Sequence, residues 1–405
     1  MIWLRDVLDE LADEAPRADL AERTIRIRER RRRRAVSLVA AAAVVAIALA
    51  ATAAVRLLPG EPDAAGRPSG GEVSDLPARG VGPLSHAYLT YCRPERGAAP
   101  RGCVHGGWRV VTRGGRTYRL ADALRSSPTG LRNSPLAISR DGRKVAYYKA
   151  AAGTFVVRDL ATGAVKAAPT RVPRAWLGSF AHLLLSDDGR FLAFTKAPRL
   201  KDPAMLFDLR ERMARPLPNG WNPIGLSPDG GTITLAEYAP KTRLQVMTHL
   251  WRTSTAGNGK AVDVSGHYLA GGLGPDGRSV AALEVASVPG TGCTRSGGDL
   301  VHLDLETGRT LRRVAIRGVS LTDHHAYLRS WVGTDEITLL TSPFRCRTDS
   351  GKQDGPAEEG ERLDPPYVPF TAYALNVRTG ETRRLATYTA QDSFYLVLPG
   401  FPGTL

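Results

Sequence analysis

Apolar segments recur in pairs around short polar turns along much of the chain. Four copies consist of an apolar run, an Asp-Gly turn and a second apolar run, and they cover residues 136–148, 183–195, 224–236 and 271–283. The turns are Asp141-Gly142, Asp188-Gly189, Asp229-Gly230 and Asp276-Gly277, spaced by 47, 41 and 47 residues. Such turns between apolar runs predict β-hairpins, because the turn needs a positive φ that glycine adopts without steric cost.

A second hairpin pattern follows most of these copies. It is a strand, a Thr-Gly turn and another strand at residues 155–167, 301–313 and 372–384, with a looser copy at 205–217. A fifth, degenerate copy of the first hairpin covers 327–341, where residues 333–336 take the turn. Each repeat therefore holds four strands, which is the content of a β-propeller blade.

The repeated motifs resemble a known family. The Ser-x-Asp-Gly-Arg-x-x-Ala and Asp-Leu-x-Thr-Gly copies, between residues 134 and 384, are similar to the WD-repeat-like blades of TolB-type propellers, although only residues 227–230 form a complete Ser-Pro-Asp-Gly. The resemblance implies an all-β propeller and is nearly silent on function, because such propellers serve many roles. The whole layout also resembles membrane-anchored actinobacterial envelope proteins without an assigned role.

The strand count predicts how the ring closes. Five blades follow from residue 136 onward, three further strands precede them at 87–92, 108–112 and 116–120, and one strand remains at 392–399. We expect this last strand to become the innermost strand of the first blade, with residues 395–398 beside 87–91. The result is a six-bladed propeller of four-stranded blades without an exposed edge.

The first 83 residues predict a membrane anchor and a linker. Residues 1–34 form a helical leader that ends in the block Arg30, Arg31, Arg32, Arg33 and Arg34, and residues 35–55 carry no charge. Twenty-one helical residues span about 30 Å, the thickness of a bilayer core. The arginine block places the leader in the cytoplasm and the propeller, residues 84–405, outside. Small residues at 48–53 could form a cleavage site, so a cleaved signal peptide is the alternative to an anchor. The Gly- and Pro-rich residues 56–83 predict a flexible linker.

All four cysteines, Cys92, Cys103, Cys293 and Cys346, follow the predicted span. An oxidising compartment and an even count favour disulfides. Cys92 and Cys103 flank one loop, and the other two lie in equivalent loops of neighbouring blades. We expect the pairs Cys92–Cys103 and Cys293–Cys346; a zinc site is the weaker alternative, because no Cys-x-x-Cys spacing occurs.

Charge narrows the class of partner. The 405 residues carry a net charge of +15, and 42% hydrophobic content indicates a globular core. Residues 1–34 contribute a net of only +2, so +13 lies beyond the span. We therefore expect an anionic envelope polymer, lipid head groups or a protein as partner, and no nucleic acid.

Motifs for catalysis are missing from the sequence. It contains no Gly-x-Ser-x-Gly, P-loop or His-Glu-x-x-His motif. His324-His325 would point opposite ways in a strand, and we interpret Asp187-Asp188 as turn residues. We expect no enzyme activity, no catalytic residue, no metal and no cofactor. The tryptophans are expected to lie in blade cores; they are Trp108, Trp176, Trp221, Trp251 and Trp331.

These features predict a single-pass cell-membrane protein whose extracytoplasmic propeller binds a protein or an envelope component. Long, variable loops at 92–107, 287–298 and 342–369 share one face with the cysteines, and we expect the partner there. Two alternatives remain. One is a ligand sensor or enzyme that uses the propeller channel, and the other is a transmembrane regulator that acts through the leader.

Overall fold

The computed structural model divides the chain into two units, Met1–Arg67 and Pro68–Leu405. The structure describes residues 73–90, 106–125, 134–178, 181–196, 203–239, 246–255, 259–287, 294–322, 324–343, 369–389 and 395–400, all in the second unit. The predicted leader, its arginine block and the apolar segment 35–55 lie outside the described residues. Within the described ranges, no helix is long and apolar enough to cross a membrane.

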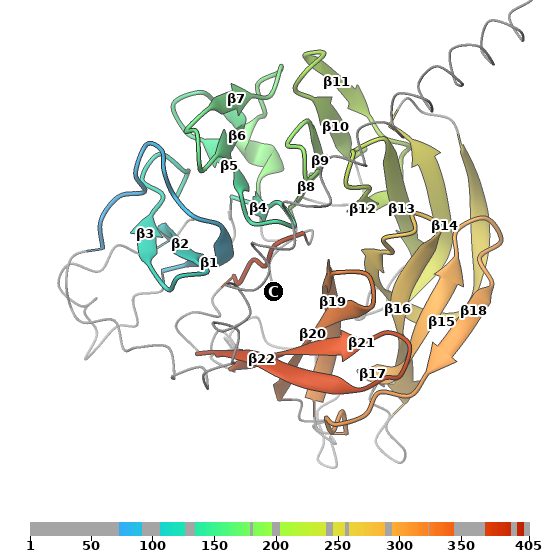
Figure 1. Ribbon diagram of the computed structural model, residues 1–405. Coiled ribbons are helices and arrows are strands. Elements are labelled where there is room, and N and C mark those ends of the chain that lie inside the picture. The colour runs from blue at the N-terminus through green and yellow to red at the C-terminus, as the bar shows by residue number, and fades with distance from the viewer. Residues whose placement is uncertain are drawn as a thin grey trace, which may run out of the picture. The chain divides into compact units, whose positions relative to one another are not determined.

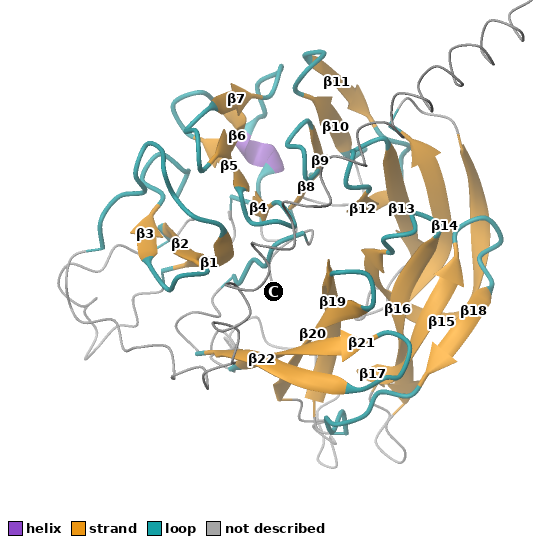
Figure 2. Cartoon of the chain, in the orientation of Figure 1, coloured by secondary structure: helices purple, strands orange, loops and turns teal. Residues whose placement is uncertain are grey.

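Five antiparallel sheets surround a common centre and form a β-propeller, which confirms the predicted all-β class (Figure 1). The strands of the first three sheets are β1 (Leu84–Leu89), β2 (Trp108–Thr112), β3 (Thr117–Arg119); β4 (Leu136–Ile138), β5 (Lys144–Lys149), β6 (Thr154–Asp159), β7 (Val165–Ala167); and β8 (His182–Leu185), β9 (Phe191–Thr195), β10 (Met205–Asp208), β11 (Met213–Pro216). The fourth sheet holds β12 (Asn222–Leu226), β13 (Thr232–Tyr238), β14 (Val246–Ser254), β15 (Gly259–Leu273), β16 (Ser279–Ser287), β17 (Thr294–Asp304) and β18 (Thr310–Val314). The fifth holds β19 (His324–Val332), β20 (Glu336–Pro343), β21 (Phe370–Asn376) and β22 (Thr382–Tyr388). Figure 2 shows a single short helical turn, η1 (Arg174–Trp176), in the described part of the chain.

The fourth sheet has seven strands because β15 belongs to two hairpins. Its first part, residues 259–263, pairs with β14 alone; in its last part, residues 268 and 269 pair with both β14 and β16, and residues 270 and 273 pair with β16. Gly266, with φ 145°, lies between the two parts. The predicted six blades therefore do not appear as six separate sheets; the described strands form five.

The Asp-Gly turns owe their shape to a shared set of hydrogen bonds. In the β8–β9 turn, the Ser186 hydroxyl donates to Asp188 Oδ1 over 2.6 Å, and the Arg190 N–H donates to the same oxygen over 3.0 Å. Gly189 has φ 72°, whereas Asp188 is not in the left-handed region. The sequence pattern thus places positive φ on the glycine alone, and the aspartate serves as an acceptor that closes the turn.

The second family of turns follows the same principle with one exception. Asp159, Asp304 and Asn376 each accept hydrogen bonds from two backbone N–H groups in the turn that follows. The glycine after each has a positive φ. In the looser copy between β10 and β11, Arg212 takes the glycine position with φ 54°. A side chain in this region costs about 1–2 kcal/mol, because Cβ approaches the next carbonyl oxygen.

The expected closure is present as a short pairing. Val397 bridges antiparallel to Ala87, with N–H···O distances of 2.9 and 2.8 Å in the two directions. The pairing stays short for two local reasons: Tyr395 is in the left-handed region with φ 54°, and Pro399 has no N–H to donate. The end of the chain thus joins the first sheet at its inner edge.

Residues just before β1 are packed, although the sequence suggested a flexible linker up to residue 83. Leu76 and Val81 are buried in the hydrophobic cluster of the first two sheets. The N–H groups of Gly80 and Val81 donate to carbonyls in the β6–β7 turn. Contact with the first two sheets therefore begins before the boundary that composition predicts.

Replacement of Arg212 by glycine is expected to stabilise the fold. Arg212→Gly should raise the free energy of unfolding by about 0.5–1 kcal/mol, because the relief of strain at φ 54° exceeds the freedom that glycine adds to the unfolded chain. Arg210→Gly, two residues earlier in the same turn, is the matched control. It should lower stability by about 0.5–1 kcal/mol, because its glycine only adds freedom to the unfolded chain. Urea unfolding of both variants measures the difference; a destabilised Arg212→Gly protein would contradict the strain.

Candidate functional site

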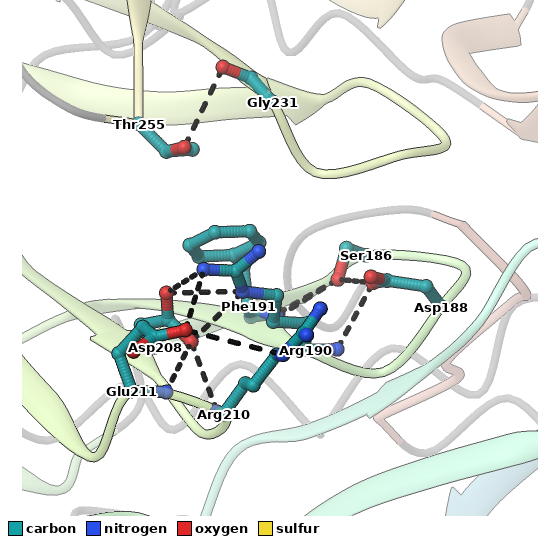
Figure 3. Close-up of polar contacts among 9 residues, drawn as sticks. All are labelled: Ser186, Asp188, Arg190, Phe191, Asp208, Arg210, Glu211, Gly231 and Thr255. Carbon is teal, nitrogen blue, oxygen red and sulfur yellow. Dashed lines mark hydrogen bonds and ion pairs between the residues drawn. The ribbon is translucent and has the colours of Figure 1, made fainter.

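One end of the propeller is built from the Asp-Gly and Thr-Gly turns, and ion pairs tie them together. Figure 3 shows Arg190, directly before β9, pairing with Asp208 at the end of β10. Arg190 Nη2 lies 2.6 Å from Asp208 Oδ2, and Nε lies 3.0 Å from both carboxylate oxygens. Asp208 Oδ1 also accepts the N–H groups of Arg210 and Glu211. One buried carboxylate thus holds two turns of the same sheet.

This environment decides the charge of Asp208. Burial alone would raise the pKa of its carboxyl, but the Arg190 guanidinium and the two backbone N–H groups together hold that pKa below its ordinary value. The Arg190 guanidinium also lies over the Phe191 ring, 4.7 Å from its centroid. The contact is therefore structural, and it fixes the β8–β9 and β10–β11 turns of this sheet.

Asp187 links two neighbouring sheets. Its Oδ1 accepts the backbone N–H of Arg140 over 2.9 Å, and Oδ2 lies 3.7 Å from Arg140 Nε. Burial raises the pKa of the Asp187 carboxyl, the N–H and charge of Arg140 oppose the rise, and the carboxylates of Asp141 and Asp188 add to it. The sequence assigned Asp187 and Asp188 to one turn; in the structure only Asp188 closes that turn, and Asp187 reaches the turn of the preceding sheet.

Beside this link lies a cavity of about 580 Å³, between the first sheet and the β19–β22 sheet. Its lining comes from the first sheet, the β4–β5 and β8–β9 turns, the β19–β22 sheet and the segment around Val397. Its apolar and aromatic part is Leu84, Trp331, Val332, Gly333, Ala372, Leu385, Tyr388, Leu398 and Pro399, and its polar part is Ser85, Arg113, Arg140, Asp141, Asp187, Ser330 and Thr338. We call it the seam cavity, because it lies where the chain closes on itself. Its volume is within the range of small-molecule and peptide side-chain pockets.

Two guanidinium groups line the seam cavity. Arg113 Nη2 donates to the carbonyl oxygen of Asp141 over 3.1 Å, and Arg140 makes the long contact with Asp187 described above. The Asp141 carboxylate closes its own turn by accepting from Ser139 and Arg143. The arrangement suits binding: an apolar body can enter the cavity while polar groups meet the arginines and carboxylates.

The other sequence-predicted residues are distributed as follows. The predicted turn residues join the two strands of four hairpins, β4–β5, β8–β9, β12–β13 and β15–β16; they are Asp141, Gly142, Asp188, Gly189, Asp229, Gly230, Asp276 and Gly277. The four cysteines and most of the long loops lie outside the described residues. In the described segments, no three His, Cys, Asp or Glu side chains are grouped to hold a metal ion.

The tryptophans divide into two groups. Trp108 and Trp331 are buried, as expected for blade cores. Trp176, Trp221 and Trp251 are only partly buried and pack against the edges of clusters. The sequence could not separate these groups, because the difference depends on how far the neighbouring sheet reaches.

Comparisons with known proteins give likenesses of fold. No protein-family model matches the sequence, and no curated protein matches it. A protein described as a TolB from Agrobacterium tumefaciens is similar in structure, at 14% identity over 80% of this chain and 97% of that one, with a TM-score of 0.43. TolB from Acinetobacter baumannii is 16% identical over 77% and 68% of the two chains, with a TM-score of 0.41. An oligogalacturonate lyase from Vibrio parahaemolyticus is 13% identical over 75% and 79%, with a TM-score of 0.42.

Loss of the charge on Asp208 is expected to destabilise the protein at neutral pH. Asp208→Asn should lower the free energy of unfolding by about 2 kcal/mol, because asparagine keeps the turn acceptor, as Asn376 does, but leaves Arg190 with the longer, 3.7 Å contact to Glu211. The folded-state pKa lies below the ordinary one, so the wild-type advantage is complete above about pH 4 and vanishes as the pH falls through the folded value.

Asp159→Asn provides the matched control. Its carboxylate occupies the same turn position but lies 3.8 Å from Lys144 and is more exposed, so its loss should cost less than 1 kcal/mol. Denaturant unfolding between pH 3 and 7 measures the loss of unfolding free energy in both variants. Equal losses for the two variants would show that the Arg190 pair adds nothing to the turn.

Proposed function

We propose that this protein is a binding module: an extracytoplasmic β-propeller, anchored by one transmembrane helix at residues 35–55, that binds a protein or an anionic envelope polymer. The proposal places the N-terminus in the cytoplasm and assigns no enzymatic activity, no cofactor and no nucleic-acid partner. The membrane part rests on the uncharged segment and on the arginine block that precedes it.

The seam cavity is the observation that carries the binding role. It offers an apolar interior with Arg113 and Arg140 in its lining, on a rigid scaffold of sheets. Basic residues also line outer strands of the propeller, as in β18 and β22, where Arg312, Arg313, Arg383 and Arg384 are exposed. Such residues protect sheet edges from pairing with other chains, and they also favour an anionic surface.

We further propose that the ring counts six blades. The seven-stranded sheet then contains two of them, which share β15, and the segment around Val397 supplies the inner strand of the first. Each blade would have four strands. The shared strand and the short closing bridge support this count.

A ligand sensor is the second candidate. The volume of the seam cavity suits a small molecule, which favours a sensor over an enzyme in the channel or a transmembrane regulator. The two candidates differ in the size of the occupant. A sensor takes up a soluble metabolite, whereas a binding module keeps its partner when small molecules are removed by dialysis.

Removal of both arginines should weaken binding to the cell envelope. The variant Arg113→Ala/Arg140→Ala, made in the full chain, is expected to bind isolated envelopes about tenfold less tightly and to lose most of the salt dependence. Arg116→Ala, in the same β2–β3 turn but outside the cavity lining, is the control and should bind like the wild type. Crosslinking capture from membranes with the wild type identifies the occupant. Salt-insensitive association that both variants retain would reject the proposal, and capture only in the presence of a soluble metabolite would favour the sensor.

A further inference from the structure

A group of aromatic and acidic side chains lies on one face of the β12–β15 half of the fourth sheet, away from the seam cavity. Its members are Trp221, Glu237, His249, Trp251 and Asp263, and we call them the Trp221 cluster. Cross-strand pairing brings them together: Glu237 lies opposite His249, and His249 lies opposite Asp263. Trp251 follows two positions after His249 on β14, so both side chains project from the same face.

The polar row of the cluster is open to solvent. Glu237 Oε2 lies 2.8 Å from His249 Nδ1, and Asp263 Oδ1 lies 3.1 Å from His249 Nε2. The side chains of Glu237, His249 and Asp263 are 43%, 39% and 94% exposed. Two carboxylates against one imidazole give these three side chains together a negative charge, on a chain whose net charge is +15.

The aromatic part of the cluster forms a corner. The Trp221 and Trp251 rings are inclined at 75° with centroids 5.3 Å apart, and Trp221 is inclined at 64° to the His249 ring, 6.4 Å away. Both tryptophans are partly buried, packed against the apolar cluster of the adjoining sheets. Of the described strands in this sheet, β12 makes the main contact with β8 and β9. Trp221 directly precedes β12, whereas the other four members of the cluster lie on β13, β14 and β15.

We propose that the Trp221 cluster binds a quaternary ammonium group, such as that of choline. Indole rings attract cations through their electron-rich faces, and two rings near a right angle present two such walls to one cation. The carboxylates of Glu237 and Asp263 supply attraction of the matching sign. Methyl groups on the nitrogen reduce its hydration, so a quaternary ammonium loses less by entering an aromatic corner than a simple ammonium does.

The same chain already contains a cation held by an indole. Lys196 Nζ lies 3.7 Å from the centroid of the Trp176 ring, and Lys196 is buried. Trp176 is partly buried, as Trp221 is, but Lys196 occupies one face of its ring. This makes Trp176 the matched control for the Trp221 cluster.

Titration of the full chain with choline chloride tests the proposal, with the protein held in phosphatidylglycerol nanodiscs and binding followed by tryptophan fluorescence and calorimetry. We expect a Kd in about the millimolar range. The neutral isostere 3,3-dimethylbutanol should bind at least about tenfold more weakly, because it has the shape of choline without the charge. Equal binding of the isostere would show that the site recognises apolar shape and not the cation, and it would overturn the proposal.

Variants locate the site. Trp221→Ala should abolish detectable choline binding, and Glu237→Gln, a surface change that preserves shape, should weaken it about threefold. Trp176→Phe should leave it unchanged. Unaltered binding in both cluster variants would place the cation elsewhere and refute the assignment, as would binding of neutral oligosaccharides in place of choline.

Vesicles distinguish two sources of the group. Association with phosphatidylcholine vesicles that free choline competes away would indicate a lipid head group, whereas binding of free choline alone would indicate a soluble ligand. Neither result depends on Arg113 or Arg140. Failure here therefore leaves the proposed role of the seam cavity standing, and the reverse also holds.

Discussion

A row of packed β-sheets becomes a ring only when its first and last sheets are joined, and in this protein the segment around Val397 joins them through its backbone pairing with Ala87 of the first sheet. The rings of His86 in β1 and Tyr388 in β22 also meet, with centroids 4.9 Å apart, so the backbone pairing and this aromatic contact together close the ring. An unpaired edge would expose N–H and C=O groups to other chains. The bridge is short because Tyr395 and Pro399 cannot extend it, and side-chain packing of Leu396 and Leu398 against β20 and β21 completes the closure.

The seam cavity follows from this mode of closure. The segment 395–400 contributes backbone to the first sheet and side chains to the last, so the two sheets meet around a strand that belongs fully to neither. Leu398 and Pro399 line the cavity together with Leu84 of β1 and Leu385 and Tyr388 of β22. The Asp187 contact with Arg140 holds the adjacent turns in place. The seam cavity and the ring closure are therefore parts of one arrangement.

Local features of this structure could be predicted from sequence, and features that depend on register could not. Strand β2 has the predicted bounds, and the glycines of the Asp-Gly turns have the predicted positive φ, because both depend on a few adjacent residues. The sharing of β15 by two hairpins could not be predicted, because no turn signal distinguishes a continuous 15-residue strand from two shorter ones. The Trp221 cluster also escaped prediction: His249 meets Glu237 and Asp263 only through the pairing of three strands, and Trp251 resembled a core residue in sequence.

Amide hydrogen exchange at Ala87 and Val397 tests the closure most directly. Each N–H donates to the carbonyl of the other residue, so we predict that both amides are protected and exchange at matching rates, through one opening event. Exchange of Val397 at the rate of an unstructured chain, with Ala87 still protected, would contradict it, because the ring would then not be closed by this segment.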